Sequence, residues 1–309
     1  MKKISVVIPC FNEEENVNTV YSRTVDVFRQ LPAYEYEIIF IDNDSRDRTV
    51  SLLREIAARD KQVKVIVNSR NFGHLRSPFH ALMNTTGDAA LMMAADLQDP
   101  PELILDFVRK WEEGYDIVLA VKEQTEERGI LPILRKIYYY FLASMAENEV
   151  VQGFHGYSLL DKKVVEALRT FQDPFPFFRS MLLEAGFRKA FVPFLQPTRK
   201  RGVTANNFYS LYDTAMLGLV QNSKVPLRLA IFVGFLIACG SFAVATGYLI
   251  RKLLYWDDVS LGIAPLIIGL FFLSGTQLIF LGVIGEYLGA VYTQVKNRPL
   301  VIERERINF

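Results

Sequence analysis

A carboxylate that could hold a divalent cation follows a short apolar run in the middle of the chain. The segment "MMAADLQDPPELI", residues 92–104, places Asp96 directly after the apolar residues 89–95, with Gln98 two positions later. Carboxylate and amide oxygens suit Mg²⁺ or Mn²⁺, which can bridge such a strand end to a phosphate. These sites usually show two carboxylates one residue apart, but the earlier position here is Ala94. Because Mg²⁺ can be bound by one or two carboxylates plus substrate phosphates, one carboxylate is sufficient in principle.

Predicted strands and helices, which would position these residues, alternate through the first part of the chain. Short apolar, mostly β-branched runs predict strands at 4–8, 37–41, 63–67, 89–94 and 117–121, separated by helices near 14–30, 48–59, 77–84 and 101–113. This alternation predicts an α/β domain with a mostly parallel sheet. Ligands of such open sheets bind beyond the carboxyl ends of the strands, so the polar residues at those ends are the site candidates.

Composition excludes several classes of protein. The 309 residues carry 35 basic and 34 acidic side chains, and this net charge of +1 argues against a nucleic-acid binder, which normally shows a basic face. The chain contains neither GxGxxG nor GxxxxGK[ST], and its three histidines lack zinc-site spacing. Cys10 and Cys239 are far apart, which predicts no disulfide framework and a reducing compartment. The acidic residues soon after the N-terminus do not fit a signal peptide, so we expect no translocation of this part.

Two long apolar runs predict a membrane hairpin. Residues 229–250 and 261–285 contain no charge and, as helices, are long enough to cross a hydrocarbon core of ~30 Å. Buried helices of a soluble protein are the alternative, but such helices rarely lack charge over this length. The outer flanks are more basic than the loop between the runs, which predicts that both flanks and the N-terminal domain face the cytoplasm. Residues 206–221 have apolar side chains at helical spacing, which fits either an interfacial helix or a core helix of the soluble domain.

Several ordered motifs carry a family resemblance. The segments "SVVIPCFNEEENV", "FIDNDSRDRT", "NFGHLRSP" and "ADLQDPPELI" together resemble a family 2 glycosyltransferase with a GT-A, Rossmann-like fold. Around the apolar runs, "SKVPLRLA", "GVIGEYLG" and "VKNRPL" resemble polyprenyl-phosphate glycosyltransferases, such as dolichyl-phosphate mannose synthases and bacterial undecaprenyl-phosphate glucosyltransferases. The resemblance implies four regions: a GT-A domain at 1–198, a juxtamembrane amphipathic region with interfacial helices at 199–228, two transmembrane helices at 229–293 (about 229–250 and 261–288), and a cytosolic tail at 294–309.

The resemblance also implies roles for individual residues. The positions that match the family's nucleotide-binding residues are Pro9, Phe11, Glu13, Asp42, Asp96 and Gln98, and the metal ligands would be Asp96 and Gln98. The positions that match its lipid-phosphate site are Lys122, Arg135 and Arg201. The catalytic residues would be Asp96, Lys122 and Arg135. Lys122 and Arg135 fit ordinary surface charges equally well. For Asn12 and Asp47 we favour helix capping, and Asp99 and Glu102 fit the start of a helix.

A second departure from the family pattern concerns the catalytic base. In "GFHGYSLLDKK", residues 153–163, Gly156 stands where the family often has an acid that is proposed as general base. A sugar hydroxyl must lose a proton on attack, but a lipid monophosphate has a second pKa of ~6 and is already anionic near neutral pH. The missing acid therefore favours a phosphate acceptor. Ala205, Ala290 and Gln294 also replace residues common in the family, so we assign no lipid contacts to them.

These observations predict an inverting glycosyltransferase of the plasma (inner) membrane. It would move a hexose from a nucleotide sugar, with UDP-glucose the expected donor, to a polyprenyl phosphate such as undecaprenyl phosphate, for cell-surface glycan modification. Mg²⁺ or Mn²⁺ would be the cofactor, no nucleic acid would bind, and a homo-oligomer stays open. Two alternatives remain: a membrane glycosyltransferase that extends a polysaccharide, and a non-catalytic scaffold that binds nucleotide sugars within a glycan assembly complex.

Overall fold

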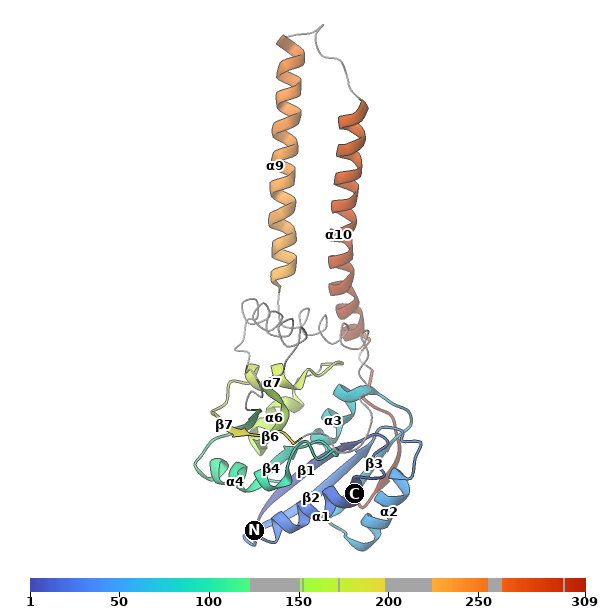
Figure 1. Ribbon diagram of the computed structural model, residues 1–309, viewed down its shortest axis with the longest axis vertical. Helices are drawn as coiled ribbons and strands as arrows, with labels where there is room; N and C mark the ends of the chain where they lie inside the picture. Colours follow the sequence, from blue (N-terminus) through green and yellow to red (C-terminus); the bar gives the residue numbers. More distant parts are fainter. Residues whose placement is uncertain (123–150, 152, 172, 198–223, 255–262, 297) are drawn as a thin grey trace. The chain divides into compact units, whose positions relative to one another are not determined.

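The chain folds into two compact units. The computed structural model describes residues 1–309 except 123–150, 152, 172, 198–223, 255–262 and 297 (Figure 1). An α/β unit comprises Met1–Ala143, Asn148–Ser210 and Asn297–Phe309, and a helical unit comprises Ser144–Glu147 and Leu211–Lys296. The C-terminal residues therefore belong to the α/β unit although they follow the helical one.

One eight-stranded sheet forms the centre of the α/β unit, with the strand order β7-β5-β6-β4-β1-β2-β3-β8. The strands are β1 (Lys2–Cys10), β2 (Tyr34–Asp42), β3 (Val63–Asn68), β4 (Ala89–Met92), β5 (Ile117–Lys122), β6 (Phe154–Asp161), β7 (Lys189–Phe194) and β8 (Glu303–Ile307). Strand β1 pairs in parallel with β2 and β4, β2 with β3, and β5 with β7. Strands β6 and β8 run antiparallel to their neighbours. The predicted mostly parallel GT-A sheet is confirmed.

Helices cover both faces of this sheet (Figure 1). They are α1 (Val17–Phe28), α2 (Thr49–Arg59), α3 (Gly73–Met83), η1 (Pro101–Leu103), α4 (Ile104–Glu112), α6 (Lys162–Arg169) and α7 (Phe178–Glu184). Successive side chains of a strand point to opposite faces, and β1 shows the consequence. Val6 and Ile8 pack in one core with residues of α1, α2 and α4, whereas Val7 packs in a second core with residues of α3, α6 and α7. Burial on both faces explains why the strands are apolar runs and not alternating ones.

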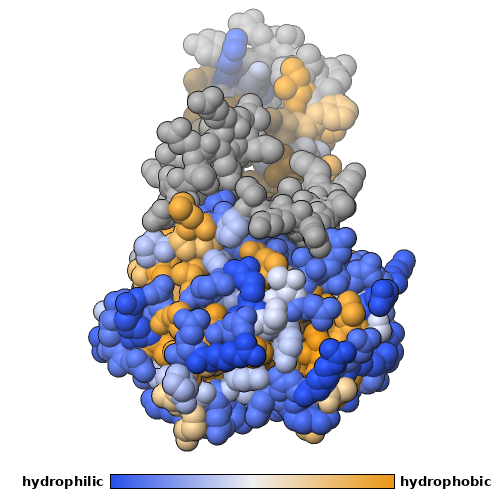
Figure 2. Space-filling model, turned by 60° about the horizontal axis from the view of Figure 1, so that its bottom comes forward, coloured by the Kyte–Doolittle hydropathy of each residue, from blue (hydrophilic) through white to orange (hydrophobic). Residues whose placement is uncertain are grey.

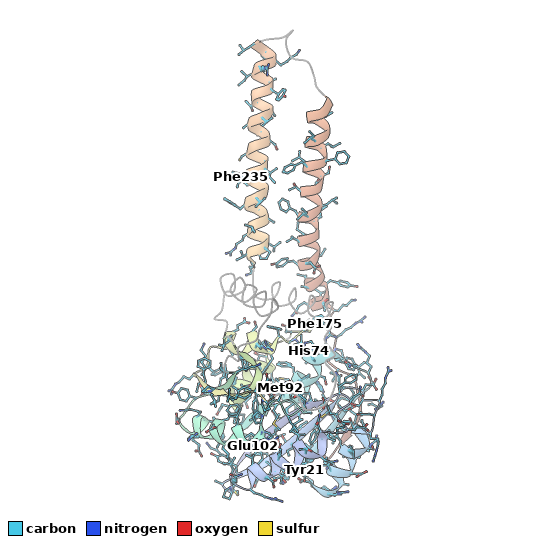
Figure 3. All side chains as sticks on the ribbon, in the orientation of Figure 1. Tyr21, His74, Met92, Glu102, Phe175 and Phe235 are labelled. Carbon is cyan, nitrogen blue, oxygen red and sulfur yellow. The ribbon has the colours of Figure 1, made fainter. Side chains whose placement is uncertain are left out.

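The helical unit contains two membrane-length helices, α9 (Val225–Leu254) and α10 (Ile263–Val295). Candidate spans lie at Val225–Leu254 and Ile268–Val295, with mean hydropathies of 2.3 and 1.9. Large apolar side chains such as Phe235, labelled in Figure 3, are exposed along them. By contrast, Figure 2 shows mostly hydrophilic residues, with apolar ones scattered between, over the face of the α/β unit that it presents. Exposed apolar helices of this length suit lipid and not water.

Several boundaries differ from the predictions. Helix α9 begins at Val225, four residues before the predicted span, because the helix continues into its basic flank. Strand β4 ends at Met92, since the chain turns before Asp96. The predicted tail contains the strand β8, which no apolar pattern indicates. Most of the predicted juxtamembrane region lies outside the described residues.

Candidate active site

The loops after β1 and β2 are fastened to each other by hydrogen bonds. The amide of Asn43 donates to the carbonyl of Cys10 at 2.9 Å, and the amide of Asn12 donates to Ser45 Oγ at 2.8 Å. In return, Asn12 Oδ1 accepts from the amide of Arg46 at 2.9 Å. The capping hypothesis for Asn12 is therefore wrong, because its side chain bridges two loops instead. Parallel neighbouring strands bring these loops to one edge of the sheet, as expected.

Asp47 has both a capping and a bridging role. Its Oδ1 accepts from the amide of Thr49 at 3.0 Å, in the first turn of α2, and its Oδ2 accepts from the amide of Glu14 at 3.1 Å. The carboxylate therefore supports the start of α2, as predicted, and also ties that start to the loop after β1.

Asp42, the last residue of β2, has a buried oxygen that no described residue meets with a hydrogen bond. Its side chain is fully buried, and Oδ2 accepts from the amide of Ser45 at 3.0 Å. Oδ1 has no hydrogen-bond partner among the described residues. Burial raises the pKa of Asp42, against hydrogen bonds from Ser45 and Asp44 and the charge of Arg304, which lower it. A buried acceptor without a donor is costly, so this oxygen fits an N–H or O–H group of a ligand.

The other predicted nucleotide-binding residues of the first loop lie at the same edge. Cys10 is the register partner of Asp42, so Phe11 follows directly at the strand end, and this residue is 40% exposed. Pro9 is half-buried within β1. The amide of Glu13 donates to Thr49 Oγ1 at 2.8 Å, which joins this loop to α2. The structure thus brings Pro9, Phe11, Glu13 and Asp42 together.

Asn43 uses its amide to hold the loop after β3. Its Nδ2 donates to Asn71 Oδ1 at 3.0 Å and to the carbonyl of Gly73 at 3.3 Å. Its Oδ1 accepts from Asn68 Nδ2 at 3.1 Å and from the amide of Phe72 at 2.9 Å. A carboxylate could accept but could not donate, so the carboxamide is the group that this network requires.

The turn after β4 presents Asp96 and Gln98. Leu97 has a φ of +62°, an outlier for a bulky side chain, and Asp96 Oδ1 accepts from the amide of Gln98 at 3.1 Å. The amide of Ala94 donates to Asp99 Oδ2 at 2.8 Å, and this hydrogen bond joins the two ends of the turn. The position that lacks the expected acid thus still contributes its backbone to this turn.

The predicted helix start is present, since η1 begins at Pro101 with Glu102 in its first turn. Both carboxylates also have other partners: Asp99 Oδ2 accepts from the amide of Ala94, and Glu102 forms an ion pair of 2.6 Å with Arg23 of α1. Tyr157, which sequence reasoning missed, is fully buried and its hydroxyl donates to the carbonyl of Pro100 at 2.7 Å. Its ring lies edge-on to that of Phe107, with centroids 4.9 Å apart, and fixes the turn from the core.

The donor set of this turn fits a divalent cation. A carboxylate at Asp96 and a side-chain amide at Gln98 offer only oxygen ligands, which hard cations such as Mg²⁺ and Mn²⁺ prefer. Among the described residues, no group of three or more His, Cys, Asp or Glu side chains could hold an ion. The protein would therefore supply part of the coordination shell, and phosphate oxygens and water would supply the rest.

Lys122 lies at the carboxyl end of β5, which reaches the same edge of the sheet as β4. Its amide donates to the carbonyl of Gly153 at 3.0 Å. Next to Lys122 the register between β5 and β6 shifts, since Leu119 pairs with Ser158 but Val121 pairs with Phe154. Strand β6 therefore has extra residues at this point and forms a bulge. Gly156, in this bulge, has a φ of +125°, which strains any residue with a Cβ. The other two predicted lipid-phosphate residues, Arg135 and Arg201, lie outside the described residues.

Several residues with a left-handed backbone conformation lie at this edge of the sheet. Asn12, Asp44 and Leu97 have φ values of 55°, 68° and 62°, and each follows the carboxyl end of a parallel strand. Such conformations are uncommon outside glycine and cluster at functional sites, where the surrounding structure fixes them. The backbone thus indicates the same edge as the polar side chains.

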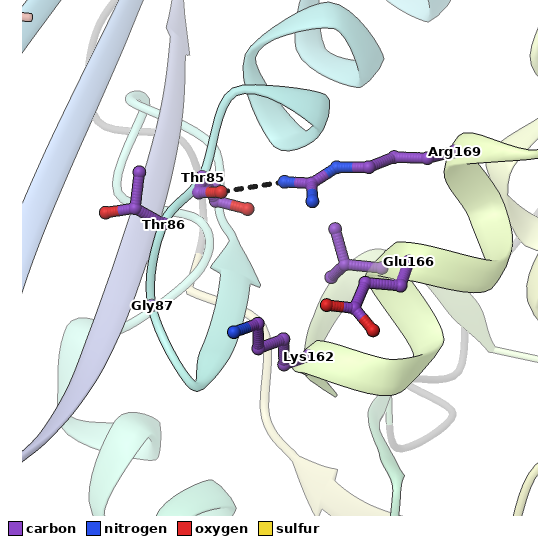
Figure 4. Close-up of a pocket in the computed structure, with 7 residues that line it drawn as sticks. Thr85, Thr86, Gly87, Lys162, Glu166 and Arg169 are labelled. Carbon is purple, nitrogen blue, oxygen red and sulfur yellow. Dashed lines mark hydrogen bonds between the residues drawn. The ribbon is translucent and has the colours of Figure 1, made fainter.

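A cavity of about 370 Å³ lies at the opposite, amino-terminal edge of the sheet (Figure 4). Its lining residues are Thr85, Thr86, Gly87, Lys162, Val165, Glu166 and Arg169. Arg169 Nη2 donates to the carbonyl of Thr85 at 2.8 Å, so this guanidinium stabilises the cavity wall. The loops described above do not reach the amino ends of the strands, and we do not assign the cavity to the active site.

The fold and these loops define a GT-A type glycosyltransferase. Residues 5–169 match the family described as glycosyl transferase family 2, and the chain belongs to that family. It is 36% identical to an uncharacterized glycosyltransferase of Synechocystis sp., over 97% of this chain and 94% of the relative. It is 34% identical to a prophage-derived bactoprenol glucosyl transferase of Shigella flexneri, over 97% of each chain. A mannosyl-3-phosphoglycerate synthase from Rubrobacter xylanophilus, 20% identical, covers 74% of each chain with a TM-score of 0.47.

Proposed function

We propose that this enzyme transfers a hexose from UDP-hexose, with UDP-glucose as the expected donor, to a polyprenyl phosphate such as undecaprenyl phosphate. The observation that carries the proposal is the full-length match to relatives named bactoprenol glucosyl transferase, which includes both apolar helices. A donor site and a membrane anchor in one chain suit a soluble donor and a lipid acceptor.

The donor would bind across the loops after β1, β2 and β4. Asp42 Oδ1 accepts an N–H of the base, and the exposed ring of Phe11 provides an apolar surface beside it, flanked by Pro9 and Glu13. Asp96 and Gln98 would hold Mg²⁺ or Mn²⁺. When bound, the ion would supply positive charge that offsets the negative charge of the leaving diphosphate.

The acceptor would attack without a protein base. An oxygen of the lipid phosphate forms a bond to the anomeric carbon while the bond from that carbon to the UDP oxygen breaks, and the electron pair leaves with UDP. Attack from the opposite face inverts the anomeric configuration. The phosphate is already anionic near neutral pH, which is consistent with a glycine at position 156. Lys122, together with Arg135 and Arg201, would bind this phosphate.

The order of the elements supports a membrane hairpin. Helices α9 and α10 would cross the membrane, with the GT-A domain and both termini in the cytoplasm. Strand β8 follows α10 yet pairs with β3 of the α/β unit. The chain on either side of the two helices therefore belongs to one unit, which supports a hairpin that returns to its starting side. The four regions 1–198, 199–228, 229–293 and 294–309 stay proposals, with β8 inside the last of them.

The decisive experiment supplies purified full-length protein with undecaprenyl phosphate and a panel of UDP- and GDP-sugars, followed by mass spectrometry of the lipid. We expect a singly hexosylated lipid phosphate, and release of UDP only in the presence of lipid. Extension of a glycan chain would favour the polysaccharide alternative. Donor binding without product from any donor would favour a scaffold and refute the proposal.

A further inference from the structure

The C-terminal strand begins at the edge of the sheet that carries the donor site. Strand β8 runs antiparallel to β3, so its first residues lie at the carboxyl end of β3. Val67 pairs with Glu305 and Asn68 pairs with Glu303, which leaves Arg304 between them without a partner in β3. Arg304 is therefore the extra residue of a β-bulge. Bulges redirect a side chain out of the regular alternation and are frequent next to active sites.

The bulge directs Arg304 towards the loop after β2. Its Nη1 lies 3.6 Å from Asp44 Oδ1, and half of the Arg304 side chain is exposed. Asp44 has a φ of +68°, a conformation that glycine adopts without the steric cost that a Cβ imposes. Two residues before it lies Asp42, whose buried Oδ1 has no hydrogen-bond partner in the part of the chain that the structure describes. The charge of Arg304 acts on the carboxyl group of Asp42, so the two groups share one electrostatic environment.

A buried acceptor beside an exposed cationic donor matches the edge of one nucleotide base. The imide edge of uracil presents a carbonyl oxygen, the N3–H donor and a second carbonyl oxygen. Guanine presents two adjacent donors, N1–H and the 2-amino group, beside its O6. Ser45 already occupies Oδ2 of Asp42, so only Oδ1 is left for a base. One such oxygen matches the single N3–H of uracil, with the guanidinium on a neighbouring carbonyl, but leaves one of guanine's two adjacent donors without an acceptor.

We propose that Arg304 is a specificity-determining residue: it donates to a carbonyl oxygen of the uracil whose N3–H is accepted by Asp42, and so favours UDP over GDP. This inference rests on the proposed UDP-hexose donor and goes beyond it by naming a residue, supplied from the far end of the chain, that reads the base. Asp44 holds the guanidinium at the rim of the site until the nucleotide binds.

The docking of β8 does not depend on Arg304. Arg54 of α2 pairs with Glu305 at 2.5 Å, and His80 of α3 lies 2.5 Å from Glu303. Asn308 Nδ2 donates to the carbonyls of Ala57 and Val63 at 2.7 and 2.8 Å. With these contacts on both sides of the strand, loss of the half-exposed Arg304 charge should leave the fold intact.

The test measures binding of UDP and GDP to the full-length protein by calorimetry. Arg304→Gln should weaken UDP binding roughly tenfold, since a charge-assisted hydrogen bond is lost, and should leave GDP binding unchanged or stronger. The matched control is Arg306→Gln, on the same strand, because Arg306 bonds Glu303 and Asn84 and should not affect either affinity. If Arg304→Gln binds UDP as tightly as the unaltered protein does, and GDP also as tightly, the inference is overturned.

Asp44→Gly separates contact with the base from a purely structural tie. It removes the partner of Arg304 and suits the left-handed backbone. If Arg304 reads the base, Asp44→Gly retains the preference for UDP and Arg304→Gln loses it. If both variants lose the preference equally, Arg304 acts only by fastening the loop, and the inference is wrong. Failure of the proposed function would appear separately, as absence of glycolipid product from the unaltered protein.

Discussion

Two buried carboxylates on strand β2 lie at opposite edges of the sheet. Glu37, at the amino-terminal edge, is 2% exposed and receives hydrogen bonds from Lys64 at 2.5 Å, Ser5 at 2.7 Å and Thr86 at 2.8 Å. Asp42, at the carboxyl edge, is fully buried and has one oxygen without a partner among the described residues. One strand thus carries a satisfied carboxylate and an unsatisfied one.

The pKa values of these two carboxylates shift in opposite directions. Burial alone would raise the pKa of Glu37, but the hydrogen bonds from Lys64, Ser5 and Thr86 outweigh it and lower the pKa. At Asp42 burial prevails and raises the pKa. The amino edge therefore stabilises the fold, whereas the carboxyl edge keeps an unmet polar group that a ligand can satisfy.

The largest effect should come from Asp96→Asn at the carboxyl edge. Loss of the carboxylate that would hold the cation should reduce glycolipid formation roughly 10³-fold, while the unfolding temperature stays within experimental error. Chelation of divalent cations should stop turnover of the unaltered protein, and added Mg²⁺ should restore it. Full activity in excess chelator would contradict the metal assignment.

At the amino edge, Glu37→Gln should reduce the free energy of unfolding by about 3 kcal/mol, because it leaves Lys64 without its buried counter-charge. The lowered pKa of Glu37 makes its contribution largest near neutral pH, and the contribution disappears as pH falls through the folded-state pKa. Denaturant unfolding at several pH values measures this loss. Glu35→Gln, an exposed acid on the same strand, is the control and should change little. A large change in the donor KM of Glu37→Gln would contradict the conclusion that the amino edge serves stability and only the carboxyl edge binds the donor.

Asp42→Asn should show the opposite pattern of stability and binding. Because the pKa of Asp42 is raised in the folded protein, its ionised form costs stability once the pH exceeds the pKa of the unfolded state. The variant should therefore be as stable as the unaltered protein or more stable at pH 7, and this gain should vanish in acid. UDP binding should weaken by about 1–2 kcal/mol, since an amide oxygen is a weaker acceptor. Thermal unfolding across pH and calorimetry with UDP measure the two effects.

The smallest effect is expected from Asn43→Asp. A carboxylate would face Asn71 Oδ1 and the carbonyl of Gly73, two acceptors that now receive hydrogen bonds. We expect a loss of about 1 kcal/mol in stability and a few-fold rise in the donor KM, because the loop after β3 loses its anchor. Steady-state kinetics with a saturating lipid acceptor measures the KM. Unchanged kinetics would show that the loop after β3 does not contribute to the donor site.

The sequence predicted the centre of the sheet better than its edges and turns. Strands β1 to β3 are apolar runs buried on both faces, and their pattern located them within a few residues. Strand β8 reads Glu-Arg-Glu-Arg-Ile and is held by backbone pairing and ion pairs, so hydrophobic periodicity could not reveal it. The left-handed conformations of Asn12 and Leu97 depend on long-range loop contacts, which a local sequence does not encode. Residues with a motif could therefore be predicted to lie at the carboxyl edge of the sheet, whereas Tyr157, which supports the turn from the core, has no motif and was not predicted.

Completion of the sheet by its last strand has a consequence for synthesis of the protein. Strand β3 is translated by residue 68, but its edge stays unpaired until β8 is made some 240 residues later, about 10–50 s at typical ribosome rates. An exposed strand edge is a template for wrong pairing during this interval. Both apolar helices are translated before β8, so the ion pair between Asp44 and Arg304 can form only after these helices have been made. The order of the chain thus delays completion of the loop after β2 until the membrane-length helices have left the ribosome.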